Sequence, residues 1–213
     1  INLIKISKTM NFDTFLIMPP AYYKYGDEDV INFYSKIIYE ISDCKIILYN
    51  FEKLSGYKFS ESCVEKLVSK FPNQIIGVKD STYNLYEKLN IKNFSVFPGS
   101  ESKLLNGLNL GCKGIITATT NVTGSLAREV YDNFLNNLPQ SSNQKLCDVR
   151  ASFEKYNLIS ALHTLMSEKN LIFENLLPPL KLLSDKEKQE LLNNLKKLDF
   201  NLETLKAAWY EFN

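Results

Sequence analysis

A lysine ends a short apolar run in the middle of the chain, which reads Ile75-Ile76-Gly77-Val78-Lys79. Such a run predicts a strand buried on both faces, as in parallel sheets. Burying an ammonium without a partner is costly, and burial favours the neutral amine, which can attack a carbonyl carbon to form a Schiff base. A lysine that only caps the strand and pairs with Asp80 is the alternative interpretation.

Two tyrosines stand at the ends of neighbouring apolar runs. Tyr49 ends the run 45–50, and Tyr22 follows the run 15–18. Because consecutive strands of a parallel sheet are usually neighbours, Tyr49 and Lys79 should approach each other. A phenol beside an amine can shuttle the protons of carbinolamine formation and dehydration. A core tyrosine bonded to a backbone carbonyl is the alternative for Tyr49.

Strand and helix patterns alternate about five times along the chain. The predicted strands cover residues 15–18, 45–50, 75–79, 95–99 and 114–118. Predicted helices begin at Asp27 and after the N-cap residue Ser60, and a third helix ends near Gly111. From Gly124 onward the pattern is helical, and a capping box at Ser184 begins the last predicted helix. This alternation indicates a parallel sheet with crossover helices.

The lack of a Gly-rich dinucleotide turn favours a TIM (β/α)8 barrel over a doubly wound sheet. About five of the eight barrel strands are present, so we expect the others to precede Ile1. The predicted organisation is the C-terminal part of the barrel in residues 1–137, followed by a C-terminal helical segment in residues 138–213.

Composition excludes several classes of protein. The net charge is +1, which gives no field to attract nucleic acid or an anionic membrane, and no apolar stretch is long enough to span a bilayer. The single histidine, His163, and four cysteines without close pairing make no zinc pattern. We therefore expect no metal site, reduced thiols and a cytoplasmic protein.

The strand-end residues resemble the pyruvate-dependent class I aldolase family that contains dihydrodipicolinate synthase and N-acetylneuraminate lyase. The similarity runs from the start to about Leu198. It rests on the order of five motifs: Pro20-Ala21-Tyr22-Tyr23, Leu48-Tyr49-Asn50 with Ser55-Gly56, Gly77-Val78-Lys79-Asp80-Ser81, Pro98-Gly99-Ser100-Glu101, and Gly114-Ile115-Ile116-Thr117 with Asn121.

The resemblance implies a role for each matching residue. Lys79 would form the Schiff base with a 2-keto acid, Tyr49 would be the acid/base, and Tyr22 would complete the proton relay, often across a subunit contact. The implied substrate-binding residues are Ser55, Ser81, Gly99, Glu101, Ser102, Thr117 and Ile116, the last through its backbone carbonyl. No metal or organic cofactor is implied, and members are commonly homotetramers built as dimers of dimers.

Two departures bear on the substrate. Leu54 stands where dihydrodipicolinate synthases usually carry an arginine that grips a carboxylate, and Lys53 would replace that arginine only as a flexible point charge. The Leu-Ser-Gly sequence instead looks like sialic-acid lyases, and Gly-Val-Lys-Asp is similar to aldolases of 2-keto-3-deoxy sugar acids. The family's early Gly-Thr-Thr-Gly-Glu-type loop, which binds the pyruvate carboxylate, is not in these residues. If the protein began at Ile1, we expect that the barrel could not close and that the carboxylate site would be missing.

The predicted function is that of a Schiff-base lyase that cleaves a 2-keto-3-deoxy sugar acid, or an N-acetylneuraminate-like substrate, to pyruvate and an aldehyde. One alternative is 4-hydroxy-tetrahydrodipicolinate synthesis from pyruvate and aspartate semialdehyde. A dehydratase of the same family is a second. The third is a non-catalytic truncated barrel that binds a keto acid or a partner chain.

Overall fold

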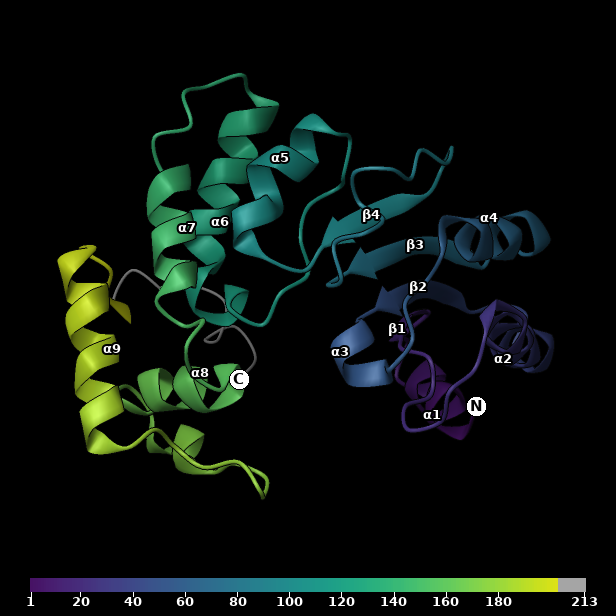
Figure 1. The fold of residues 1–213 in the computed structure, drawn as a ribbon. Coiled ribbons are helices and arrows are strands. Elements are labelled where there is room, and N and C mark those ends of the chain that lie inside the picture. Colours follow the sequence, from purple (N-terminus) through teal and green to yellow (C-terminus); the bar gives the residue numbers. More distant parts are fainter. Residues whose placement is uncertain (203–213) are drawn as a thin grey trace. The chain divides into compact units, whose positions relative to one another are not determined.

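The computed structural model describes residues 1–202 and divides the chain into two compact units (Figure 1). The first unit consists of Ile1–Gly99 and Asn106–Ile116. The second consists of Ser100–Leu105 together with the chain from Thr117 onward. The division expected after residue 137 stays a prediction.

The first unit is built on a four-stranded parallel sheet with the strand order β1-β2-β3-β4. Its strands are β1 (Thr14–Ile17), β2 (Lys45–Asn50), β3 (Ile75–Asp80) and β4 (Ser95–Pro98). The arrows of β2, β3 and β4 point the same way in Figure 1. The predicted parallel sheet and four of its predicted strands are confirmed.

The fifth predicted strand, at 114–118, is wrong. The segment runs beside β4, where Lys113 N–H donates to the Val96 carbonyl at 3.1 Å and Ile116 N–H donates to the Pro98 carbonyl at 3.2 Å. A regular parallel ladder would place the second bond one residue earlier. Gly114, with a φ of 138°, takes up the extra residue. Pro98 also has no N–H to return to the segment, so the ladder ends at β4.

Helices α2 (Asp27–Glu40) and α4 (Glu61–Lys70) bury their apolar sides in the same core as the sheet. The predicted apolar side of α2 is confirmed, since Val30, Ile31, Tyr34, Ile37 and Ile38 are buried. Ser60 caps α4 as predicted, because its hydroxyl accepts a hydrogen bond from Cys63 N–H at 3.0 Å. The other helices are α1 (Asn2–Thr9), the single turn α3 (Glu52–Ser55) and α5 (Leu104–Asn109). The segment between β3 and β4 consists of turns and bends.

The sheet has two unlike faces at its carboxyl end. Leu48 and Asn50 of β2, and Val78 and Asp80 of β3, are buried on the side of the helical core. Tyr49 and Lys79, which alternate with them, are half-buried on the opposite face. Because side chains alternate along a strand, a shift of one residue in the pairing would exchange the two sets.

The second unit is helical. It contains α6 (Thr120–Leu135), α7 (Asn143–Ala151), α8 (Leu158–Ser167), α9 (Asp185–Lys197) and the 3-10 helices η1 (Glu101–Lys103) and η2 (Leu171–Glu174). Its core includes Val122, Val149, Leu165 and Leu191. The predicted capping box of Ser184 and Glu187 is confirmed. Residues 203–213 of the predicted helical end lie outside the described residues.

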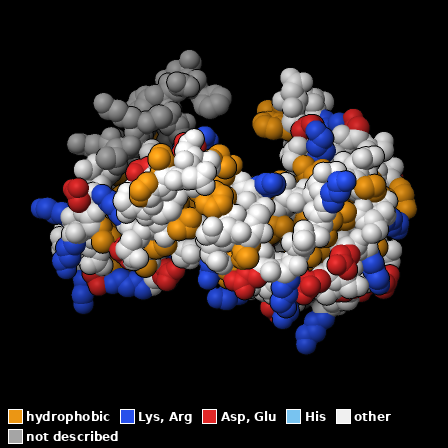
Figure 2. Space-filling model, turned by 90° about the horizontal axis from the view of Figure 1, so that it is seen from above, with side chains coloured by type: hydrophobic (Ala, Val, Ile, Leu, Met, Phe, Trp, Pro, Cys, Tyr) orange, Lys and Arg blue, Asp and Glu red, His pale blue; other side chains and the backbone are white. Residues whose placement is uncertain are grey.

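Surface charge is mixed. Figure 2 shows Lys and Arg side chains interspersed with Asp and Glu side chains over the face in view, in keeping with the net charge of +1. None of the helices that residues 1–202 form combines the length and apolar character that a membrane crossing needs.

Candidate active site

Tyr49 and Lys79 are paired residues on neighbouring strands. They occupy the same level of the β2–β3 ladder, and the Lys79 ammonium lies 4.2 Å from the centroid of the Tyr49 ring. The Tyr49 ring stacks in turn on Phe51, with centroids 5.9 Å apart and an angle of 30° between the planes. The predicted approach of lysine and tyrosine is therefore confirmed, and their roles in a reaction stay predictions.

The next pair along the ladder, Asn50 and Asp80, faces the core. Asn50 Nδ2 donates to Asp80 Oδ1 at 2.8 Å. The two Asp80 oxygens also accept hydrogen bonds of 2.8–3.2 Å from four backbone N–H groups in the turns after β3, those of Thr82, Tyr83, Leu85 and Tyr86. The carboxylate that the alternative interpretation pairs with Lys79 is therefore occupied on the opposite face of the sheet.

Ser81 and Gly99 are in contact at the ends of β3 and β4. A Cβ atom on Gly99 would lie 2.2 Å from Ser81 Oγ, so the approach of the two segments requires glycine there. The backbone carries the ladder one step further, because Gly99 N–H donates to the Asp80 carbonyl at 2.9 Å. Ile116 lies beside the same strand end through its hydrogen bond to Pro98.

Tyr22 lies apart from this pair. Its side chain is 91% exposed, and its ring packs edge-on against Tyr23 with centroids 4.9 Å apart. Its φ of 91° is unusual for a residue with a side chain. Within residues 1–202 no described contact joins Tyr22 to Tyr49 or Lys79, so its place in a proton relay stays a prediction.

The turn after β2 holds Ser55 and Leu54. The Ser55 hydroxyl is buried and donates to the backbone carbonyls of Phe51 and Tyr57 at 3.1 and 2.9 Å. Leu54, at the position of the expected arginine, is 57% exposed. Its side chain offers no hydrogen-bond donor, so this position cannot grip a carboxylate.

Glu101, in the second unit, is fully buried. Its Oε1 accepts a hydrogen bond from Thr123 at 3.0 Å, and its Oε2 accepts one from Thr117 at 3.1 Å. Arg150 Nε lies 3.4 Å from Oε2. Burial raises the pKa of Glu101, and the hydrogen bonds together with the Arg150 charge offset part of that rise. Two predicted substrate-binding residues, Glu101 and Thr117, are thus bonded to each other.

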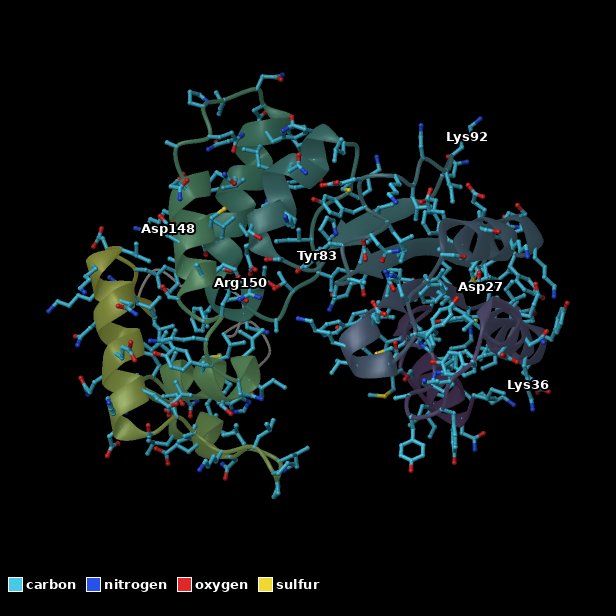
Figure 3. All side chains as sticks on the ribbon, in the orientation of Figure 1. Asp27, Lys36, Tyr83, Lys92, Asp148 and Arg150 are labelled. Carbon is cyan, nitrogen blue, oxygen red and sulfur yellow. The ribbon has the colours of Figure 1, made fainter. Side chains whose placement is uncertain are left out.

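Arg150 reaches Glu101 from α7 (Figure 3). Its buried Nε and Nη1 atoms have no hydrogen-bond partner among the described residues, so the pair is held by charge more than by hydrogen-bond geometry. Ser102, by contrast, is exposed, and its hydroxyl lies 3.1 Å from that of Ser100. The roles predicted for Glu101, Ser102, Thr117 and Ser55 in substrate binding stay predictions.

Sequence reasoning missed Asn50, Asp80 and Arg150 as partners in these networks. Asn50 and Asp80 each directly follow a predicted site residue at a strand end, which is a usable signal for a buried polar pair. Arg150 gave no such signal, because it is one of several charged residues along a helix. Within residues 1–202 no cluster of His, Cys, Asp and Glu fit to hold a metal ion is found.

Comparison with known proteins identifies the family. Residues 1–198 match the dihydrodipicolinate synthetase family, and the chain belongs to it. Members of this family are pyruvate-dependent lyases and aldolases. The resemblance of the strand-end motifs is thereby confirmed.

Two curated relatives show the range of the family. A 2-dehydro-3-deoxy-D-gluconate/2-dehydro-3-deoxy-phosphogluconate aldolase of Picrophilus torridus is 28% identical over 186 residues, which are 84% of this chain and 68% of that protein. An N-acetylneuraminate lyase of Clostridium perfringens is 30% identical over 138 residues, 62% of this chain and 46% of that protein. The chain spans less than half the length of other relatives that it matches.

Solved structures show the same fold. The 4-hydroxy-tetrahydrodipicolinate synthase of Methylacidiphilum fumariolicum superposes with a TM-score of 0.83 at 20% identity. The match covers 93% of this chain and 68% of that one. The chain thus shares its fold with about two thirds of that structure.

Proposed function

We propose that the chain carries the Schiff-base lysine of a pyruvate-dependent aldolase that acts on a 2-keto-3-deoxy sugar acid. The observation that carries the proposal is the placement of the Lys79 ammonium 4.2 Å from the centre of the Tyr49 ring, at paired positions of adjacent strand ends. In open and closed parallel sheets alike, ligands bind at the carboxyl ends of the strands.

The chemistry follows from the two side chains. The neutral Lys79 amine attacks the keto carbon, and the carbinolamine loses water to give a protonated imine. A base then takes the proton of the hydroxyl on the fourth carbon, and the imine accepts the electron pair of the bond between the third and fourth carbons, so the bond breaks, an aldehyde leaves and an enamine remains. The enamine takes up a proton at its carbon, and water then hydrolyses the imine to release pyruvate and the lysine. In this proposal Tyr49, whose ring lies beside the amine, gives and takes the protons.

The substrate class rests on Leu54 and on the relatives. Leu54 has no charge with which to hold the carboxylate of aspartate semialdehyde, which argues against dihydrodipicolinate synthesis. The Picrophilus torridus aldolase, which is named for 2-dehydro-3-deoxy acids, matches over 84% of this chain. Ser81 and Gly99, in contact beside Lys79, would face the sugar tail.

We also propose that β1–β4 are four strands of a (β/α)8 barrel. The supporting observations are the four parallel strands in sequential order and the TM-score of 0.83 with a dihydrodipicolinate synthase. The remaining strands would correspond to the third of the relatives that the chain does not span. A homotetramer in the cytoplasm, as the resemblance implies, is part of the same proposal.

Borohydride trapping with pyruvate tests the proposal. We expect a reduced adduct on the peptide that contains Lys79, identified by mass spectrometry, and no adduct in Lys79→Arg. Arginine keeps a cation over Tyr49 but is never deprotonated in proteins, so it is the matched control. An adduct absent from folded wild-type protein, or found on another lysine, would overturn the proposal.

Separate assays of two reactions, cleavage of a sugar acid and condensation of pyruvate with an aldehyde, test the substrate class. We expect 2-keto-3-deoxygluconate to be cleaved to pyruvate, while pyruvate with aspartate semialdehyde gives little product. Leu54→Arg restores a bidentate carboxylate donor and should raise the use of aspartate semialdehyde. Efficient synthesis from that aldehyde by the wild type would favour the dihydrodipicolinate alternative.

A further inference from the structure

We propose that Asn50 and Asp80 are positioning residues that hold Tyr49 and Lys79 in register, and that they act from the opposite face of the sheet. The inference rests on the proposed function, because it explains how the lysine and the tyrosine are presented. Neither Asn50 nor Asp80 would touch the substrate.

The two pairs are consecutive steps of one ladder. Tyr49 pairs with Lys79, and Asn50 pairs with Asp80 one residue later, where β2 and β3 end. The last step of a ladder is where strands separate most easily, because few bonds lie beyond it; here these are Ser81 N–H to the Asn50 carbonyl and Glu52 N–H to the Thr82 hydroxyl, both at 2.9 Å. The 2.8 Å hydrogen bond from Asn50 Nδ2 to Asp80 Oδ1 closes that step with a side-chain link in addition to the backbone.

Asp80 fixes the chain that follows the lysine. The turns after β3 have no helix or ladder to use their backbone N–H groups, and Asp80 accepts four of those groups. Leu85 and Tyr86, which supply two of them, are buried, so their N–H groups have no water as an alternative partner. The course of residues 82–86, which follow Ser81, therefore depends largely on one carboxylate.

Asn50 ties the segment after β2 into the same network. Its Oδ1 accepts a hydrogen bond from Phe59 N–H at 3.1 Å, and its Nδ2 also donates to Asn84 Oδ1 at 2.9 Å. Asn84 Nδ2 then donates to the Phe59 carbonyl at 3.0 Å. The segments that follow β2 and β3 are thus fastened to each other behind the two reactive side chains.

The network of Asn50 and Asp80 does not itself contact the reacting groups. Asn50 and Asp80 are both fully buried on the core face, where their polar atoms need hydrogen-bond partners and cannot reach substrate on the opposite face. A buried polar network that is fully satisfied defines one arrangement of its members. Because the network lies directly behind Lys79 and Tyr49, it would keep these two side chains oriented. A small misplacement of the Lys79 amine slows its attack on the keto carbon.

Borohydride trapping of pyruvate on Asn50→Leu tests the inference. The rate constant at saturating pyruvate and the half-saturating concentration are measured separately, each per folded molecule as determined by near-ultraviolet circular dichroism. We expect the rate constant to fall about 10- to 100-fold while the half-saturating concentration changes little, because attack is misaligned but binding surfaces remain.

Ser60→Ala is the matched control, since its hydroxyl bonds Cys63 N–H at the start of α4 and the Asp27 carboxylate, neither of which belongs to the network. It should lower stability and leave trapping per folded molecule unchanged. Asp80→Asn is the second variant, in which one oxygen is replaced by a donor that faces backbone N–H groups, and it should slow trapping at least as much as Asn50→Leu.

The outcomes separate the two proposals. No adduct on Lys79 in the wild type would overturn the proposed function, and this inference with it. An adduct in the wild type with equal rates per folded molecule in Asn50→Leu and in Ser60→Ala would overturn this inference alone. A reduced rate that the control does not share supports it.

Discussion

Each of the two units buries a carboxylate completely, and the two carboxylates are satisfied in opposite ways. Asp80 in the first unit is held by backbone N–H groups of its own following turns and by Asn50. Glu101 in the second unit is held by two threonine hydroxyls and the charge of Arg150, which come from residues 16 to 49 positions further along the chain.

The two carboxylates therefore differ in whether they can be substituted without leaving buried partners unpaired. Backbone N–H groups remain whatever residue stands at position 80, so removing Asp80 leaves donors without acceptors. The partners of Glu101 are side chains, which can be replaced together with it. We therefore expect Asp80 to be irreplaceable and Glu101 to be replaceable as part of a pair.

The largest expected effect is that of Asp80→Ala. The N–H groups of Leu85 and Tyr86 and one N–H of Asn50 are buried, and each would lose this acceptor at about 1–3 kcal/mol, so the loss should be about 3–9 kcal/mol. That is comparable with the whole stability of many domains. Urea unfolding followed by circular dichroism would measure the loss, and a loss under about 1 kcal/mol would contradict the comparison.

Glu101→Ala should cost less, about 3 kcal/mol, because it leaves the Arg150 charge buried without its carboxylate. Combining Glu101→Leu with Arg150→Met should recover most of that loss, since an apolar pair can replace a buried ion pair. A double-mutant cycle by urea unfolding gives the coupling. If the double variant were no more stable than Glu101→Ala, the pair would not be replaceable.

The pH dependence of stability that Glu101 causes should be a smaller effect, and its direction follows from the shift of the Glu101 pKa. Burial raises the pKa of Glu101 above its usual 4.5, so the folded protein keeps this proton to higher pH than the unfolded chain does. The carboxylate's contribution to stability therefore falls as the pH rises from 4.5 through the folded pKa.

Comparison with Glu101→Gln isolates that contribution. The free energy of unfolding of the wild type minus that of Glu101→Gln should decrease as the pH rises through this range. The measurement is urea unfolding at a series of pH values. A difference that increases with pH would mean that the attraction of Arg150 outweighs burial.

The smallest expected effect is at an exposed carboxylate. Asp132 pairs with Arg128 one helical turn away at 2.8 Å, and both side chains are largely open to water. Asp132→Ala should change stability by about 0.5 kcal/mol or less. Urea unfolding of Asp132→Ala gives the reference value for loss of an exposed carboxylate. If that loss were as large as the losses at Asp80 and Glu101, burial would not explain the effects at those two residues.

Local sequence determined much of this protein. The apolar runs predicted four strands, the cap at Ser60 and the capping box at Ser184 predicted helix starts, and the motifs at strand ends indicated the family. These features depend on residues close together in the chain, so their pattern is legible without a structure. The meeting of Tyr49 and Lys79 was also predictable, because consecutive parallel strands are usually neighbours.

Other features were decided only by the tertiary structure. Residues 114–118 have the composition of a strand, yet Pro98 on the neighbouring strand has no N–H to offer them, and Gly114 breaks the spacing of the bonds that do form. The burial of Glu101 against Arg150 likewise depends on residues far apart in sequence. Periodicity specifies which elements form, whereas the partner of a backbone or buried polar group is set by whichever chain segment packs against it.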